Sequence, residues 1–247
     1  MDYDLIICDI DGCLASESGG PFDLEPLARV AACNDRAARG DGPPITVCTG
    51  RPLPFAEAVC RLIHNTSTPC VCENGVWLYH PATNRYERDP AITAGDLAAV
   101  QGASRLLEER FAAEGFTQYP GKTASVTLYH PRRERLPEIV PEVDRLLADR
   151  GWPFRVSMTW DYINIDLPKI DKASGLRRLF AATGVDPRRS MAIGDTDGDL
   201  PMADAVAWFG CPANASAAVK QRADYVSPEK EIAGVLDILA RAANNPS

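Results

Sequence analysis

Short apolar runs alternate with helical patterns at the start of the chain. The runs cover residues 5–8, 45–48 and 70–72, and between them apolar side chains recur every three or four positions, over 24–31 and 55–63. Strands that are apolar on both faces are typical of parallel sheets covered by helices. The pattern therefore predicts a β-α-β-α-β unit with a parallel sheet.

This alternation breaks after about residue 76. A hairpin is predicted around the turn 81–84, helices over 94–114 and 135–150, and strands at 154–159 and 162–167, with further strand material between the two helices. These elements predict a smaller unit in which helices pack on one side of an antiparallel or mixed sheet.

The β-α rhythm returns with a helix from Lys172 and a strand at 190–193. We therefore expect an α/β fold with a doubly wound, parallel-sheet core made of residues 1–79 and 169–247. A smaller α+β cap domain, residues 80–168, is inserted between these two parts of the core.

The strands of the predicted cap alternate between apolar and polar positions, so their two faces differ. One face is expected to cover the helices of the cap. The other face either meets solvent or roofs a site on the core. The apolar set is Val126, Leu128, Val156, Met158, Ile163, Ile165 and Leu167, and the polar set is Ser125, Thr127, Tyr129, Arg155, Ser157, Tyr162, Asn164 and Asp166.

Composition and charge narrow the range of partners. The chain has 247 residues, 45% of them hydrophobic, and a formal net charge of -8, which argues against nucleic acid or an anionic membrane as a partner. It opens on a strand pattern and has no apolar run of transmembrane length, so we expect a cytoplasmic protein. The eight cysteines form no Cys-x-x-Cys pair and are expected to be buried thiols. Monomer and homodimer both stay open, and a frayed tail is expected from Asn244.

Charged and hydroxyl side chains gather where the core strands are expected to end. Carboxyl ends of parallel strands lie along one edge of a sheet, so these groups can converge there. Two carboxylates one residue apart repel each other unless a cation or a shared proton relieves them, which favours Mg2+; the alternative is a solvated Asp-x-Asp-Gly turn. The groups are Asp9 with Asp11, Thr49 with Gly50 and Arg51, Lys172, and Asp195 with Asp199.

In this order the groups resemble the motifs of the haloacid dehalogenase superfamily of phosphohydrolases. Those motifs are an Asp-x-Asp strand end, a Ser/Thr strand end, a lysine and a Gly-Asp-x-x-x-Asp loop, and the resemblance spans the whole chain. An insert between the second and third motifs is similar to the type IIB group of sugar-phosphate and related phosphatases. Further matching segments are Val47–Pro52, Glu73–Gly75, Asp171–Leu176 and Gly194–Met202.

The resemblance implies a phosphatase that works through an aspartyl phosphate. Asp9 is the expected nucleophile, and Asp11 is expected to protonate the leaving alkoxide and then to deprotonate the attacking water. Lys172 adds a positive charge for the phosphoryl group, and its spacing to the following helix fits the family better than that of Lys169.

The resemblance also implies Mg2+ as the cofactor. Two positions depart from the family pattern: Cys13 stands where a Thr or Val is usual, and Gly198 where an Asn is usual. The second departure predicts a less firmly held metal loop. The expected ligands are Asp9, the main chain of Asp11, Asp195, and Asp199 as a direct or an indirect ligand.

The expected substrate is a small phosphate ester, such as a sugar phosphate or phosphoglycolate, because the polar face of the cap suits a hydroxylated molecule. Thr49 and Gly50 are expected to bind phosphoryl oxygens, with Arg51 and Asn74 beside them. Candidates for a second anionic group are Arg155, Lys122, Arg132 and Arg133.

Two other functions stay open. Eukaryotic phosphomannomutases share the general plan, which makes a phosphomutase possible, although their metal loop is longer than residues 194–202. A catalytically silent protein that binds a phosphometabolite is the other alternative, and the presence of every acidic motif residue argues against it.

Overall fold

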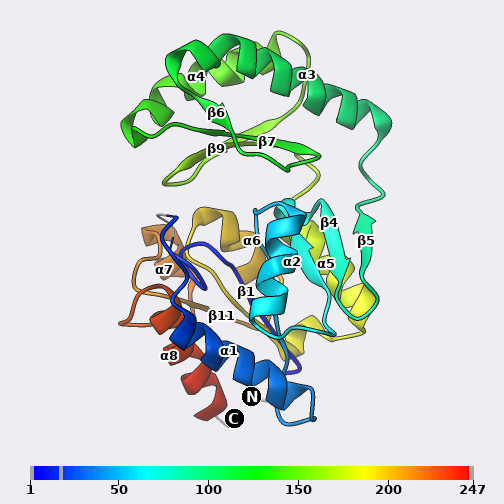
Figure 1. The fold of residues 1–247 in the computed structure, drawn as a ribbon, viewed down its shortest axis with the longest axis vertical. Helices are drawn as coiled ribbons and strands as arrows, with labels where there is room; N and C mark the ends of the chain where they lie inside the picture. The colour runs from blue at the N-terminus through cyan, green and yellow to red at the C-terminus, as the bar shows by residue number, and fades with distance from the viewer. Residues whose placement is uncertain (1–2, 17–18, 245–247) are drawn as a thin grey trace.

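The computed structural model describes residues 3–16 and 19–244 (Figure 1). A cap stands over a core, with the helices of the cap at the top of Figure 1 and its sheet turned toward the core. Of the tail predicted from Asn244, all but that residue lies outside the described ranges. Every cysteine is a free thiol, and all but Cys33 are buried, as predicted.

Five strands of the described core form a parallel sheet in the order β12-β11-β10-β1-β2. The central strand β1 pairs with both neighbours, with Leu5 opposite Ser190 and Ile6 opposite Ile45. Its residues are buried on both faces, which explains why its sequence is apolar throughout. The strands are β1 (Leu5–Cys8), β2 (Ile45–Val47), β10 (Ser190–Ile193), β11 (Trp208–Cys211) and β12 (Tyr225–Val226).

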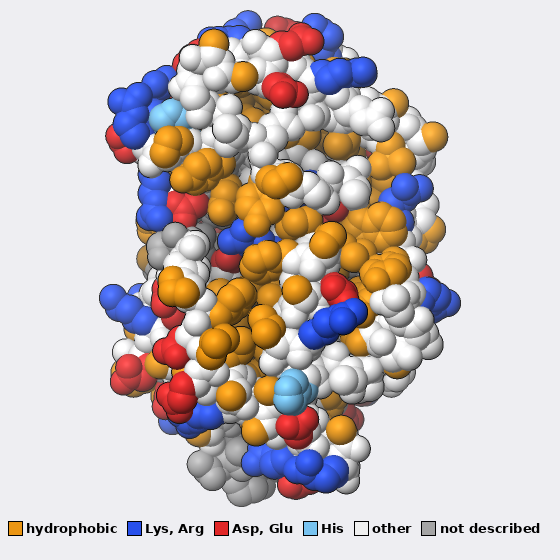
Figure 2. Space-filling model, viewed as in Figure 1, with side chains coloured by type: hydrophobic (Ala, Val, Ile, Leu, Met, Phe, Trp, Pro, Cys, Tyr) orange, Lys and Arg blue, Asp and Glu red, His pale blue; other side chains and the backbone are white. Residues whose placement is uncertain are grey.

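Helices cover both faces of this sheet, which confirms the doubly wound fold. One buried cluster joins the sheet to the first group of helices, and a second cluster joins it to the other group. Figure 2 shows hydrophobic side chains gathered over α2 on the front of the core. The first group is α1 (Leu24–Ala37), α2 (Leu53–Leu62) and α8 (Glu231–Asn244), and the second is α5 (Lys172–Thr183), α6 (Leu200–Ala203) and α7 (Ala217–Arg222).

The predicted hairpin belongs to the core. Strand β3 (Cys70–Cys72) continues the sheet edge through a parallel bridge between Cys48 and Val71, and it pairs antiparallel with β4 (Trp77–His80). Strand β5 (Arg85–Arg88) then pairs with β4. The hairpin crosses the predicted boundary at residue 80, and we therefore propose that the cap begins after β5.

The cap has the predicted α+β layout, with two long helices on one face of an antiparallel sheet in the order β6-β7-β9-β8. A capping box at Thr93 and Asp96 starts the first helix. The helices are α3 (Ala94–Phe111) and α4 (Leu136–Ala148), and the strands are β6 (Thr117–Gln118), β7 (Ser125–Tyr129), β8 (Arg155–Met158) and β9 (Tyr162–Asp166). Short 3-10 turns lie at Glu73–Gly75, Ala112–Glu114, Arg133–Arg135, Pro187–Arg189 and Asp197–Asp199.

One residue of the predicted apolar face was placed wrongly. Val126, Leu128, Ile163 and Ile165 pack against the helices of the cap as expected. Met158 is 50% exposed instead, because it is the last residue of the edge strand β8. The edge of the cap sheet therefore carries an apolar side chain into the space below.

A buried carboxylate of the core fastens the cap. Glu73, which follows β3, is 1% exposed and accepts four hydrogen bonds from the start of β7 and the residues before it. The donors are the main-chain N-H groups of Thr123 (2.7 Å) and Ala124 (2.8 Å) and the hydroxyls of Thr123 (2.9 Å) and Ser125 (3.0 Å). Buried donors need partners, so Glu73 fixes where this end of the cap sits.

We predict that Glu73→Ala lowers the free energy of unfolding by about 3 kcal/mol, because it leaves several buried donors without an acceptor. Urea unfolding followed by circular dichroism measures this change. The exposed Glu229→Ala serves as the control and should stay within about 0.5 kcal/mol of wild type. Equal stability of the two variants would contradict the fastening role.

Candidate active site

A buried lysine lies between two of the predicted carboxylates. Lys172 begins α5, and its Nζ is 3.0 Å from Asp9 Oδ1 at the end of β1 and 2.5 Å from Asp199 Oδ1. All three side chains are less than 10% exposed. Against the opposing effect of burial, Asp199 and Asp9 raise the pKa of Lys172 well above its usual value, so the ammonium stays charged. Lys169 instead pairs with Asp96 on the surface.

The carboxylates of Asp9, Asp195 and Asp199 gather so that one oxygen of each lies within 4.8 Å of the others. Burial raises the pKa of Asp9 to about 8, even though Lys172 lowers it. Among the described residues Asp9 Oδ1 accepts no hydrogen bond, although it is buried. Carboxylate oxygens gathered in this way are the ligands that a hard divalent cation such as Mg2+ prefers.

Asp199 holds the loop rather than offering a spare oxygen. Its Oδ2 accepts from the N-H groups of Asp195 (3.0 Å) and Thr196 (2.9 Å), and its Oδ1 accepts from Lys172. Both oxygens are therefore occupied. Of the two roles left open for Asp199, this geometry favours the indirect one.

Asn214 supports the cluster and was missed from the sequence. Its amide donates to the carbonyl of Gly12 (2.9 Å) and to Asp195 Oδ2 (3.3 Å). Gly12 has a φ of +71°, and a Cβ there would lie 2.0 Å from the same carboxylate, so only glycine fits. Gly198, which stands where the family usually has an Asn, lies in the 3-10 turn Asp197–Asp199. In this chain the side-chain amide of Asn214 reaches Asp195.

Asp11 lies apart from the carboxylate cluster. Its two oxygens accept from Arg51 Nη2 (2.5 Å) and Nε (2.6 Å), in a two-point ion pair. Arg51 also donates to the hydroxyl of Tyr119 in the cap, and its guanidinium lies 4.9 Å from the ring centre of Phe55 and 5.7 Å from that of Tyr162. Arg51 thus joins the Asp-x-Asp turn of the core to the aromatic side chains of the cap.

Thr49 and Gly50 follow strand β2, and the chain there packs closely against Asn74. The Thr49 hydroxyl accepts from the N-H of Arg51 (3.1 Å), and the Thr49 carbonyl accepts from the N-H of Asn74 (3.0 Å). A Cβ on Gly50 would lie 3.0 Å from Asn74 Oδ1, so the glycine allows this close approach. The Asn74 amide donates to Asp166 of the cap (3.3 Å).

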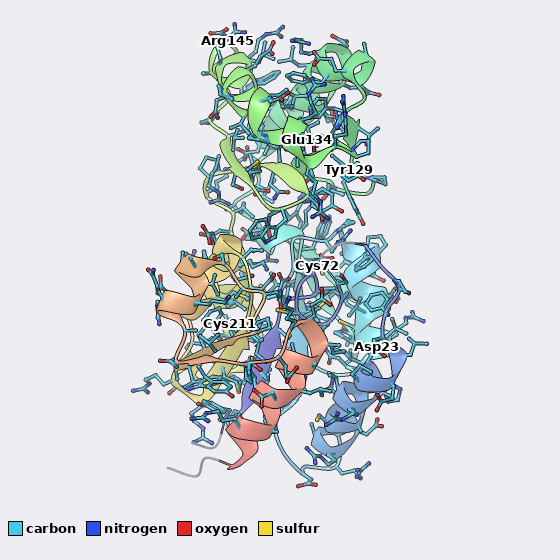
Figure 3. All side chains as sticks on the ribbon, turned by 90° about the vertical axis from the view of Figure 1, so that its left-hand side faces the viewer. Asp23, Cys72, Tyr129, Glu134, Arg145 and Cys211 are labelled. Carbon is cyan, nitrogen blue, oxygen red and sulfur yellow. The ribbon has the colours of Figure 1, made fainter. Side chains whose placement is uncertain are left out.

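These groups open into a cavity of about 560 Å³ between core and cap. Its floor includes Asp9, Lys172 and Thr49, and polar residues of the cap sheet form its roof. The sequence left open whether the polar face of the cap sheet meets solvent or roofs a site on the core. Six of its residues line the cavity and so form part of its roof: Thr127, Arg155, Ser157, Tyr162, Asn164 and Asp166. Figure 3 shows this junction from the side, with Cys72 just below the cap and Tyr129 within it.

The four residues predicted as candidates to bind a second anionic group of the substrate lie in different places in the structure. Lys122 and Arg155 line the cavity. Arg155 donates to the carbonyl of Ile170 (3.1 Å) and lies 3.8 Å from Asp166. Arg133 pairs with Asp161 beside a different cavity, and Arg132 is exposed outside both. The cavity also has an apolar rim, made of Met158, which the sequence had predicted to face the cap helices, and Trp160, to which the sequence assigned no role.

Comparison with known proteins agrees with this fold. A family model for haloacid dehalogenase-like hydrolases matches residues 103–239. A phosphoglycolate phosphatase from Methanopyrus kandleri is 28% identical over 240 residues, which cover 96% of each chain. One from Haloarcula marismortui is 26% identical and covers 97% of this chain and 98% of its own. A solved structure of a Thermoplasma acidophilum protein superposes with a TM-score of 0.75 at 18% identity and covers 98% of both chains.

The chain therefore belongs to the family of haloacid dehalogenase-like hydrolases. This confirms the resemblance read from the motifs, and with it an enzyme of the hydrolase class. The described helices include none that is long and apolar enough to cross a membrane.

We predict that saturating Mg2+ raises the melting temperature of the wild-type protein by roughly 5–10 °C, because bound ligand stabilises only the folded state. Asp195→Asn should remove most of this shift. Asp197→Asn is the matched control, since Asp197 lies in the same loop, outside the carboxylate cluster, and should keep the shift. Differential scanning fluorimetry at several Mg2+ concentrations measures it. Equal shifts in all three proteins would contradict the assigned site.

Proposed function

We propose that the protein is a Mg2+-dependent phosphatase that hydrolyses a small phosphate monoester through an aspartyl phosphate. The observation that carries this proposal is the buried carboxyl group of Asp9 at the floor of the cavity, where its Oδ1 lies 3.0 Å from the Lys172 ammonium and accepts no hydrogen bond from the described residues. A carboxylate placed in this way is a nucleophile aimed at whatever fills the cavity. The matched family and the names of the relatives support phosphoric monoester hydrolysis.

In the first step an oxygen of Asp9 attacks phosphorus and the bond to the ester oxygen breaks. The Thr49 hydroxyl and the N-H of Gly50 contact phosphoryl oxygens, and Lys172 offsets their charge. The electron pair of the broken bond goes to the leaving oxygen, which takes a proton from Asp11. Asp9 and Asp195, with the main chain of Asp11, would hold Mg2+, whose charge would offset the repulsion between carboxylate and phosphate.

In the second step water attacks the phosphorus of the aspartyl phosphate and gives a proton to Asp11, and the bond between phosphorus and the Asp9 oxygen breaks. Inorganic phosphate leaves, Asp9 is again a carboxylate, and Asp11 has regained the proton that it gave in the first step. Asp11 must reach the leaving oxygen, so its ion pair with Arg51 has to loosen or turn when substrate is bound. Arg51 therefore positions the acid and base of the reaction without contacting phosphorus.

Phosphoglycolate and sugar phosphates are the proposed substrates. The roof of the cavity carries hydroxyl, amide and charged groups, which suit a small polar leaving group. Two relatives that span the chain carry the name phosphoglycolate phosphatase. Transfer of phosphate from a sugar bisphosphate without net release would favour the phosphomutase alternative, and binding without turnover would favour the silent one.

We predict that wild-type protein releases phosphate from such esters only with Mg2+, and that Asp9→Asn lowers the rate by roughly a thousandfold or more, because the nucleophile is lost. A malachite green assay over an ester panel measures the release. The surface variant Asp186→Asn should match wild type. Full activity of Asp9→Asn would contradict the mechanism.

We predict that Asp11→Asn slows hydrolysis of alkyl phosphates by about 10²- to 10⁴-fold, the usual contribution of general acid and base catalysis. The first step with p-nitrophenyl phosphate should lose far less, because a nitrophenolate leaves without a proton. Burst kinetics of nitrophenol release compare the two. An equal loss of the first step for both kinds of ester would argue against Asp11 as the acid.

A further inference from the structure

Most cationic side chains that line the catalytic cavity are paired with a carboxylate. Arg51 pairs with Asp11, and Arg155 faces Asp166. Lys122 differs: within residues 3–16 and 19–244, no carboxylate lies within 4.0 Å of its ammonium, and no hydrogen bond engages it. The cavity thus contains one cation whose partner the described protein does not supply. The lining cations are Arg51, Lys122, Arg155 and Lys172.

The loop that carries Lys122 lies close to the core before this residue and is hydrogen-bonded to the core after it. Before it, Gly121 has a φ of +87°, and a Cβ there would lie 3.5 Å from Pro52 at the start of α2. After it, Glu73 of the core binds the main chain of Thr123 and Ala124. Lys122 is therefore held at a set position above the second strand end, as a binding residue needs to be.

The nearest carboxylates are already engaged. Glu73 accepts its four hydrogen bonds from residues 123–125, and Asp166 accepts from Asn74 and faces Arg155. Burial lowers the pKa of Lys122, while Asp166 and Glu73 act in the opposite direction. An anion that binds a half-buried ammonium without a carboxylate partner gains the free energy of a charge-assisted hydrogen bond.

We infer that Lys122 binds a second anionic group of the substrate, a carboxylate on the leaving-group side. This inference rests on the proposed phosphatase function and narrows it to esters that carry such a carboxylate. The phosphoryl end is served by Lys172, Thr49 and Gly50 at the floor, which leaves Lys122 in the cap loop for the far end of the molecule. A neutral ester would leave the ammonium unmatched, so Lys122 selects between the two kinds of substrate.

The test compares two esters that differ at one group. 2-Phosphoglycolate carries the carboxylate, and 2-hydroxyethyl phosphate has an alcohol in its place. With Mg2+ present, Lys122→Met should lower kcat/KM for 2-phosphoglycolate by roughly 10- to 100-fold, the usual contribution of a charge-assisted hydrogen bond, and change that for 2-hydroxyethyl phosphate by less than about twofold. Lys122→Arg should keep a larger part of the activity, because it keeps the charge.

Lys230→Met is the matched control, since Lys230 is exposed and is not among the residues that line the cavity, and it should leave both kcat/KM values unchanged. Equal effects of Lys122→Met on the two esters, or no effect on either, would overturn the inference and leave the phosphatase intact. A wild-type enzyme that prefers the neutral ester would do the same. Failure of the wild-type protein to hydrolyse any ester of the panel would instead overturn the proposed function, and this inference with it.

Discussion

The ion pair network around Lys172 is the constraint on which the active site depends. One ammonium faces Asp9 and Asp199, and the carboxylate of Asp195 lies beside them. Such a cluster is costly to bury unless each charge has a partner. The parallel sheet brings these side chains together, because β1 and β10 are neighbours and end at the same edge. Carboxylate oxygens from both strand ends thus meet within reach of one divalent cation, which is the basis of the proposed metal site.

Charged side chains of the core also hold the junction between core and cap. Glu73 and Arg51 both follow core strands, and both reach into the cap, one through hydrogen bonds to residues 123–125 and one through the hydroxyl of Tyr119. The cap is thus placed by groups that belong to the catalytic edge of the core. A substrate that disturbs the Arg51–Asp11 pair would change a contact of the cap at the same time, which links binding in the cavity to the position of its roof.

Sequence patterns predicted the core strands closely, because each is an apolar run that ends in a polar turn. The predicted strand 190–193 coincides with β10, and the groups at the ends of β1 and β10 meet as expected. Asn214 could have been found by the same logic, since it follows β11 at that edge. The exposure of Met158, and the lack of a carboxylate partner for Lys122 among the described residues, could not be predicted. Both depend on tertiary packing, which periodicity does not encode.

The measurement that tests the central claim most directly is a search for phosphorylated Asp9. The Asp11→Asn protein is mixed with p-nitrophenyl phosphate and Mg2+, quenched in acid within the first turnover, digested and analysed by mass spectrometry. This variant should accumulate the intermediate, because a good leaving group departs without the acid while the attack of water lacks its base. The account predicts a phosphoryl group on the peptide that contains Asp9. Release of nitrophenol with no phosphorylated peptide, or with the phosphoryl group on another residue, would contradict it.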